Sequence, residues 1–145
     1  GDKVKTRIRA RKWIIAAAVL AAMFLAVMLI CRKDKIPGET ATDRVTFAKS
    51  LGYSISEQYE TKKDIVIPSV FSDVYENYNA LQKNNGFDLS AYKGEQAEVY
   101  TYPVTNHPEG DGVMMNIIVC KGRIIGGDIC SAEYDGFMTG LVRTS

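Results

Sequence analysis

GVMMNIIVC-KG-RIIGGDICS, residues 112–131, consists of two apolar runs that are separated by Lys121-Gly122. Such runs favour β-strands, and a two-residue connection ending in glycine favours a tight hairpin. The stretch therefore predicts two antiparallel strands over 112–120 and 123–131. In an unbroken register Cys120 lies opposite Arg123, and Cys130 lies opposite Val113 at the far end. The cysteines then stand about 23 Å apart, beyond the ~7 Å limit for a disulfide, so we expect both to be small buried hydrophobic residues.

Upstream runs extend this hairpin into a sheet. Residues 96–104 predict a third strand, which a turn rich in proline and glycine joins to the hairpin. Residues 64–68 predict another strand that Pro68 ends, and the loose alternation over 53–59 predicts a weaker one. With helices before it, this antiparallel β-meander belongs to an α+β domain.

Two helices are expected before the meander. Thr40 and Asp43 have the spacing of a capping box, and Gly52 is placed to end the helix that follows. The apolar spacing over 70–85 predicts a second amphipathic helix. Its expected core face holds Phe71, Val74, Tyr75, Tyr78 and Leu81, and the residues expected away from that face are Asp73, Glu76, Asn79, Gln82 and Lys83.

Residues 13–30, WIIAAAVLAAMFLAVMLI, form an apolar run of 18 without charge, glycine or proline. As a helix this run spans about 27 Å, close to the ~30 Å hydrocarbon core of a bilayer. We therefore expect one transmembrane anchor from Trp13 to Ile30. A cleaved signal peptide and a lipoprotein signal cut before Cys31 are the alternatives, but Met28-Leu29-Ile30 lacks the small side chains that such cuts need.

The charges that flank the anchor predict its orientation. The tail 1–12 carries six basic residues and one acid, whereas the linker 31–40 carries three basic residues and two acids. Because basic segments stay in the cytoplasm, we expect the tail inside and the domain 41–145 outside, in a single-pass protein of the cell membrane. Gly1 is not an initiator methionine, so we expect the sequence either to be a fragment of a longer chain or to carry an added residue at its start.

The domain 41–145 carries nine basic and 14 acidic residues, a net charge of −5. A nucleic-acid backbone would be repelled by this charge, so we expect no nucleic-acid partner. The expected partners are the membrane, through residues 13–30, and an unidentified envelope protein or small ligand.

Short stretches in a fixed order along the domain carry a family resemblance. They are Ile67-Pro68, Tyr75-Glu76-Asn77-Tyr78-Asn79, Leu81-Gln82-Lys83, Gly86-Phe87-Asp88-Leu89, Tyr92-Lys93-Gly94, Tyr100-Thr101-Tyr102, Ile125-Gly126-Gly127-Asp128-Ile129-Cys130 and Asp135-Gly136-Phe137-Met138. With them, residues 44–142 resemble an uncharacterised bacterial family catalogued as domain of unknown function 4830. The resemblance implies a small domain behind an N-terminal membrane segment, and it implies no activity or catalytic residues.

Catalytic signatures are absent from the sequence. The one histidine, His107, lies in the turn-forming stretch 106–112, and the motifs of nucleophile elbows, phosphate loops and zinc proteases are missing. A Cys–His pair is geometrically feasible only with Cys130. We therefore expect no enzyme, and a cell-envelope enzyme is the weakest of three hypotheses.

Carboxylates gather in two loops that the hairpin brings to one end of the sheet. Glu109 and Asp111 precede one strand, Glu133 and Asp135 follow the next, and Asp128 is close by. Carboxylates are ligands that Ca²⁺ prefers, so these loops are a hypothetical metal site for Ca²⁺, the one cofactor considered. The simpler interpretation is that they are solvated turn residues.

Gly126-Gly127 interrupts the last strand of the hairpin. A bulge or the close approach of a packed helix explains such glycines most simply. The alternative is a ligand that lies against bare main chain, with Asp128 as its polar contact. The leading functional hypothesis is a membrane-tethered, extracytoplasmic interaction or sensing module without catalysis, and a cation- or small-ligand-binding domain is the second.

Overall fold

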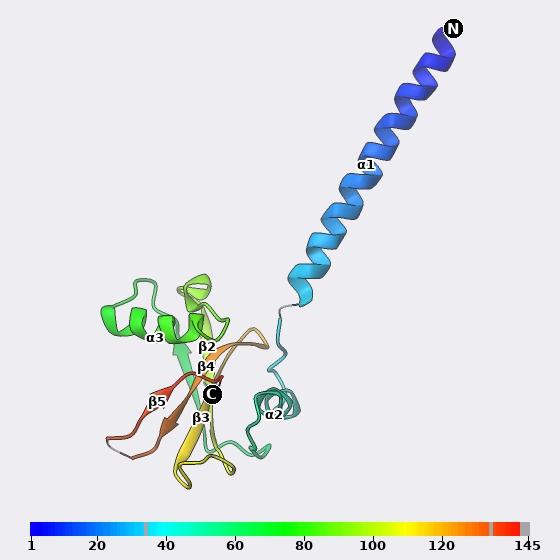
Figure 1. Ribbon diagram of the computed structural model, residues 1–145. Helices are drawn as coiled ribbons and strands as arrows, with labels where there is room; N and C mark the ends of the chain where they lie inside the picture. Colours follow the sequence, from blue (N-terminus) through cyan, green and yellow to red (C-terminus); the bar gives the residue numbers. More distant parts are fainter. Residues whose placement is uncertain (34, 134, 143–145) are drawn as a thin grey trace. The chain divides into compact units, whose positions relative to one another are not determined.

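The computed structural model describes residues 1–33, 35–133 and 135–142 (Figure 1). The chain forms two compact units, of which the second begins at Ile36. The first unit is dominated by one long helix, and the second is an α+β domain.

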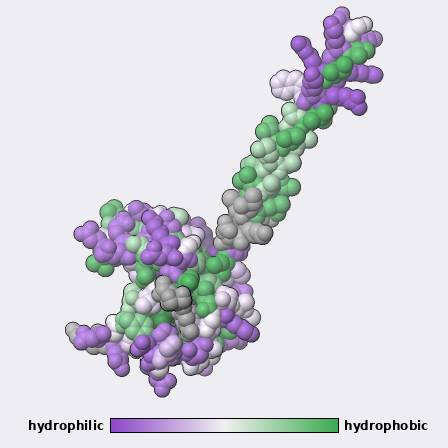
Figure 2. Space-filling model, in the orientation of Figure 1, coloured by the Kyte–Doolittle hydropathy of each residue, from purple (hydrophilic) through white to green (hydrophobic). Residues whose placement is uncertain are grey.

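The helix of the first unit, α1, runs from Asp2 to Lys33 and contains the apolar run. Its segment Asp2–Leu29 is long and apolar enough to cross a membrane, and none of its most apolar window is buried in protein. Figure 2 shows hydrophobic side chains along the visible side of this helix, beyond a hydrophilic N-terminal end. The helix expected for residues 13–30 is therefore confirmed.

The domain is built on one five-stranded antiparallel sheet in the order β1-β2-β3-β4-β5, which confirms the predicted α+β class. Each strand pairs with its neighbour in sequence, as in a meander. The strands are β1 (Thr61–Val66), β2 (Gln96–Pro103), β3 (Val113–Cys120), β4 (Arg123–Ser131) and β5 (Met138–Thr139). Residues 53–59 form no strand, because the segment is instead tied to the loop after β2, where Ser54 N donates to Asn106 Oδ1 at 2.8 Å.

The two faces of the sheet are covered by different helices. Helix α2 (Ala41–Ser50) packs Phe47 and Ala48 on one face, here called the α2 face, whose core also holds Tyr102, Ile117 and Ile129. The capping box of this helix is formed as predicted: Asp43 N donates to Thr40 Oγ1 at 3.1 Å, and Thr40 N donates to Asp43 Oδ2 at 3.0 Å.

Helix α3 (Asp73–Lys83) and the 3₁₀ helix η1 (Leu89–Tyr92) cover the opposite, α3 face, over a smaller core that includes Leu89, Ile118 and Ile125. The expected helix is present, but its predicted core face is wrong in part. Val74 is 79% exposed, whereas Asn79 and Gln82 are fully buried.

The domain begins before the residue that the sequence predicts. Arg44 of α2 is buried, and its guanidinium donates to the carbonyl oxygens of Gly38 and Glu39 at 2.8 and 2.9 Å and to Tyr102 Oη at 2.6 Å. Ile124 N donates to Ile36 O at 2.9 Å. Residues 36–39, assigned above to the linker, are therefore held on the domain.

The β3–β4 hairpin has the predicted tight turn but not an unbroken register. Lys121 and Gly122 both have positive φ, 49° and 73°, as a two-residue type I′ turn requires. A β-bulge at Ile118/Val119 leaves an extra residue on β4, so Cys130 lies opposite Met114 and not opposite Val113. Cys120 and Cys130 are both free, and Cys120 is buried as expected, while Cys130 is half-buried.

Candidate ligand-binding groove

The predicted ligand site at Gly126 and Gly127 is filled by protein. A Cβ atom on Gly126 would lie 2.7 Å from Gln82 Oε1, and Gly127 N donates to this same oxygen at 2.9 Å. Both glycines are buried. A Cβ atom on Gly127 would meet the Asn116 carbonyl and Leu141 of the α2-face core. Gly126 therefore serves the close approach of α3, and protein atoms cover the main chain at both glycines.

Asp128 is 3% exposed and belongs to a polar network on the α3 face. Tyr78 Oη donates to Asp128 Oδ2 at 2.7 Å, and Asn116 Nδ2 donates to Asp128 Oδ1 at 2.9 Å. Asn116 in turn accepts from Thr101 Oγ1 at 2.6 Å. Because both carboxylate oxygens already have donors inside the protein, Asp128 is a structural acid and not the ligand contact proposed from the sequence.

Burial changes the acidity of this network. Desolvation raises the pKa of Asp128, although the hydrogen bonds from Tyr78 and Asn116 oppose that rise. Desolvation and, next, the Asp128 carboxylate raise the pKa of the Cys130 thiol. Since a thiol of raised pKa carries less thiolate, Cys130 is poorly suited to nucleophilic chemistry.

His107 has a packing role on the other side of the sheet. Its ring stacks on Phe137 at 5.7 Å between centroids and on Tyr53 at 6.4 Å, and its Nδ1 accepts from Glu109 N at 3.2 Å. The Cys130 thiol lies instead beside Asn116, with Nδ2 3.5 Å from Sγ. The Cys–His pair considered above is not formed.

The acidic loops meet, but they do not assemble a ligand set. Ala132 N donates to Gly112 O at 2.8 Å, so the two loops adjoin as the hairpin predicts. The side chains of Glu109, Asp111, Glu133 and Asp135 are exposed. Within the described ranges, no three His, Cys, Asp or Glu side chains converge on a point where a metal ion could sit. The hypothetical Ca²⁺ site therefore has no support from the geometry.

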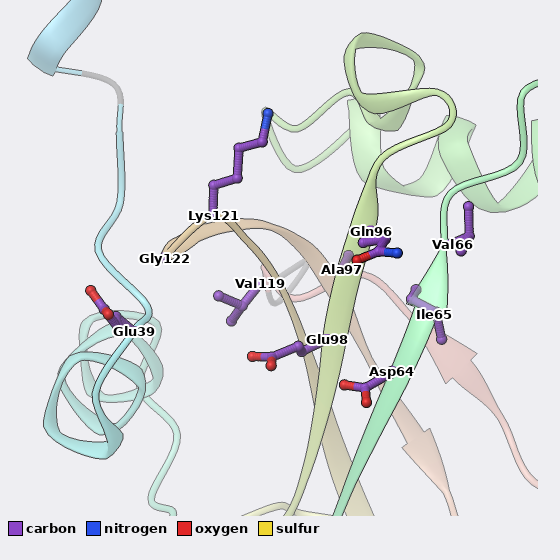
Figure 3. A pocket seen from close by; sticks show the side chains of 10 residues that line it. All are labelled: Glu39, Asp64, Ile65, Val66, Gln96, Ala97, Glu98, Val119, Lys121 and Gly122. Atoms are coloured by element: carbon purple, nitrogen blue, oxygen red, sulfur yellow. The ribbon is translucent and has the colours of Figure 1, made fainter.

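A groove of about 620 Å³ that the sequence did not predict lies at the other end of the hairpin, along β1 and β2 (Figure 3). Its wall is formed by Asp64, Val66 and Glu98 of the first two strands and by Val119 of β3, while Glu39 lies across from them. Figure 3 shows the Asp64 and Glu98 side chains directed from the strands toward the side where Glu39 lies. The volume falls within the range of ordinary ligand sites.

The charges in this groove are not balanced. Asp64 and Glu98 are direct cross-strand partners, an arrangement of like charges that is unfavourable by itself. Lys62 Nζ lies 2.6 Å from Glu98 Oε1, and this contact lowers the pKa of the Glu98 carboxyl. Lys121 pairs with Glu95 at 3.2 Å, and Figure 3 shows its side chain pointing away from the carboxylates. In the described part of the chain, no lysine or arginine lies within 4.0 Å of the Asp64 or Glu39 carboxylate.

The sequence does not predict this groove because its residues come from four separate segments, namely the stretch before α2, β1, β2 and the end of β3 with the turn that follows. Asp64 and Glu98 meet only through the register of β1 with β2. Glu39 stands in the segment 31–40, which the sequence predicts to be a linker. The one local signal is Lys62-Lys63-Asp64, a charged stretch at the start of an otherwise apolar strand.

Comparison with known proteins gives the family of the chain. Residues 47–129, more than half of the chain, match the family described as a domain of unknown function, DUF4830, so the chain belongs to this family. The resemblance noted from the short stretches is confirmed. No curated protein and no solved structure matches the chain.

Proposed function

We propose that this member of the DUF4830 family is a single-pass membrane protein whose domain lies outside the cytoplasm and binds an extended, basic segment of another envelope protein, without catalysis. The observation that carries the proposal is the groove along β1, in which the Asp64 carboxylate of the edge strand and the Glu39 carboxylate across the groove have no ion pair among the described residues. The membrane, the side on which the domain lies and the partner are all parts of the proposal.

The tether is supported by α1. The most apolar window of its described segment Asp2–Leu29 is not buried in protein at all, and Trp13 is 77% exposed at the start of the apolar span. In water such a surface is unfavourable at roughly 25 cal/mol for each Å² of apolar area, whereas a bilayer accommodates it. The excess of basic residues before the span supports a cytoplasmic N-terminus.

The form of the ligand follows from the sheet edge. Among the residues that the structure describes, β1 pairs only with β2, so its outer backbone groups have no strand partner there. An extended peptide adds to such an edge through main-chain hydrogen bonds, and neighbouring side chains select its sequence. Val66, 60% exposed, offers an apolar contact at the same place.

The charge of the ligand follows from Asp64 and Glu39. A lysine or arginine on the incoming segment would reach two carboxylates that lack an internal ion pair. It would also relieve the repulsion between Asp64 and Glu98. Such complementarity raises the association rate and fixes the register of the bound segment.

Site-specific photocrosslinking tests this function. A photoreactive residue placed at Val66, inside the groove, should capture a partner in the native membrane. The same residue at Val70, which is 84% exposed but outside the groove lining, should not. Equal capture from both positions would contradict the proposal.

A charge-removal pair sharpens the same experiment. Glu39→Gln with Asp64→Asn should lower the yield from Val66, because the basic segment loses its counter-charges. Glu133→Gln with Asp135→Asn removes one glutamate and one aspartate at the opposite end of β4 and should leave the yield unchanged. If Glu39→Gln with Asp64→Asn leaves the crosslinking yield from Val66 unchanged, the proposal that the bound segment is basic is wrong.

A further inference from the structure

Three sulfur-bearing side chains stand in one row across β3, β4 and β5. Met114 lies opposite Cys130, and Cys130 lies opposite Met138. Directly opposed residues of antiparallel strands project from the same face, with Cβ atoms about 4.5–5.5 Å apart. Two thioethers therefore flank one thiol.

This row lies on the α3 face, away from the groove. Asn116 and Asp128 are two residues from Met114 and Cys130 on their strands, and their side chains join Tyr78 of α3. Because side chains alternate along a strand, the sulfur row shares that face. The groove opens on the α2 face, where Glu98 and Val119 lie in line with Tyr100 and Ile117.

The row can be reached from solvent. Met138 is 56% exposed, and Met114 and Cys130 are half-buried. Cys130 is a free thiol. Methionine has three rotatable side-chain bonds, so either thioether sulfur can swing toward the thiol without a change in the strands.

We propose that Met114, Cys130 and Met138 form a three-coordinate site for Cu(I). Thiolate and thioether sulfurs are soft ligands that select Cu(I) over the harder divalent ions. Binding of one Cu⁺ forms three Cu–S bonds and releases the thiol proton of Cys130 to water, with no change in oxidation state. The site does not depend on the peptide groove and goes beyond the function proposed above.

Competition for Cu(I) tests the site directly. The full chain is purified in detergent with Cys31→Ser in every variant, so that only Cys120 and Cys130 supply thiols. It is titrated under reducing, oxygen-free conditions against bathocuproine disulfonate, whose Cu(I) complex is coloured. We expect one Cu(I) for each chain and a rise in melting temperature when it binds, because the three sulfurs are brought together only by the folded sheet and the ion therefore binds the folded protein more tightly.

The variants separate the three-sulfur site from adventitious thiol binding. Cys130→Ser should abolish binding. Met114→Leu and Met138→Leu should each lower the affinity for Cu(I) at least about tenfold, because removal of a residue that only supports a metal ligand already has an effect of that size. The matched controls are Met115→Leu, next to Met114 but buried on the α2 face, and Cys120→Ala at the other end of β3; both should bind as the wild type does.

Three results would overturn the proposal. The first is a wild-type chain that takes no Cu(I) from the chelator. The second is a wild-type affinity in Met114→Leu and Met138→Leu, which would mean that the thiol binds alone. The third is an equal loss of Cu(I) affinity in Met114→Leu and Met115→Leu, when both variants keep the wild-type melting temperature in the absence of copper.

Discussion

The α2 face and the α3 face of the sheet hold their helices by different means. Under α2 two of the three buried helix residues, Phe47 and Ala48, are apolar and belong to the same core as Ile129, while the third, Arg44, hydrogen-bonds to Tyr102. Under α3 two of the most buried helix residues, Asn79 and Gln82, are polar, and their side chains bond to the main chain of Leu89 and Gly127. Most of the buried α2 residues are therefore apolar, whereas the buried α3 residues are held by hydrogen bonds.

The largest expected effect comes from the apolar face. Ile129→Ala removes a fully buried side chain and should lower the free energy of unfolding by ~2–5 kcal/mol. Val74→Ala, at an exposed position of α3, should change it by under ~0.5 kcal/mol. Urea denaturation of both variants measures the difference, and similar small losses would mean that the α2 face is not the main core.

A smaller loss is expected from the polar face. Gln82→Ala leaves the buried Gly127 N–H without its acceptor, which should lower the free energy of unfolding by about 1–3 kcal/mol. Its exposed neighbour Lys83→Ala is the control, with under ~0.5 kcal/mol expected. If the two variants are equally stable, hydrogen bonding does not hold α3.

The smallest effect is a pH dependence on the same face. Burial raises the pKa of Asp128 in the folded domain above its value of 3.8 when unfolded. The stability that its neutral form contributes is therefore full below about pH 3.8 and is lost as the pH rises through the folded pKa. Denaturation between pH 3 and pH 7 should show the wild type losing stability relative to Asp128→Asn over that rise. A constant difference, or one of opposite sign, would show that Asp128 is not desolvated.

The sequence predicts the parts of this fold that rest on repeated local patterns. The apolar run of α1, the capping box at Thr40 and the Lys121-Gly122 turn each need only a few neighbouring residues, and each is present. The strand predicted over residues 53–59 is not formed. A loose alternation of apolar residues is a weak signal for a strand, and the loop after β2 supplies a hydrogen-bond partner for this segment instead.

The rest depends on contacts between distant residues. The bulge at Ile118/Val119 shifts Cys130 by one position, and no local pattern gives its place. Asn79 and Gln82 look solvated until their main-chain partners are known. The groove needs Glu39, Asp64 and Glu98 from three segments, so the sequence led instead to the acidic loops and to Gly126-Gly127.

The most direct measurement for the central claim, a membrane-tethered domain outside the cytoplasm, is labelling of intact cells with a membrane-impermeant maleimide. Val70→Cys places a thiol at an exposed position of the domain, and Lys3→Cys places one in the basic tail; the wild-type chain gives the background from native cysteines. We expect Val70→Cys to be labelled in intact cells and Lys3→Cys to be labelled only after permeabilisation. Labelling of Lys3→Cys in intact cells, with Val70→Cys protected, would contradict it.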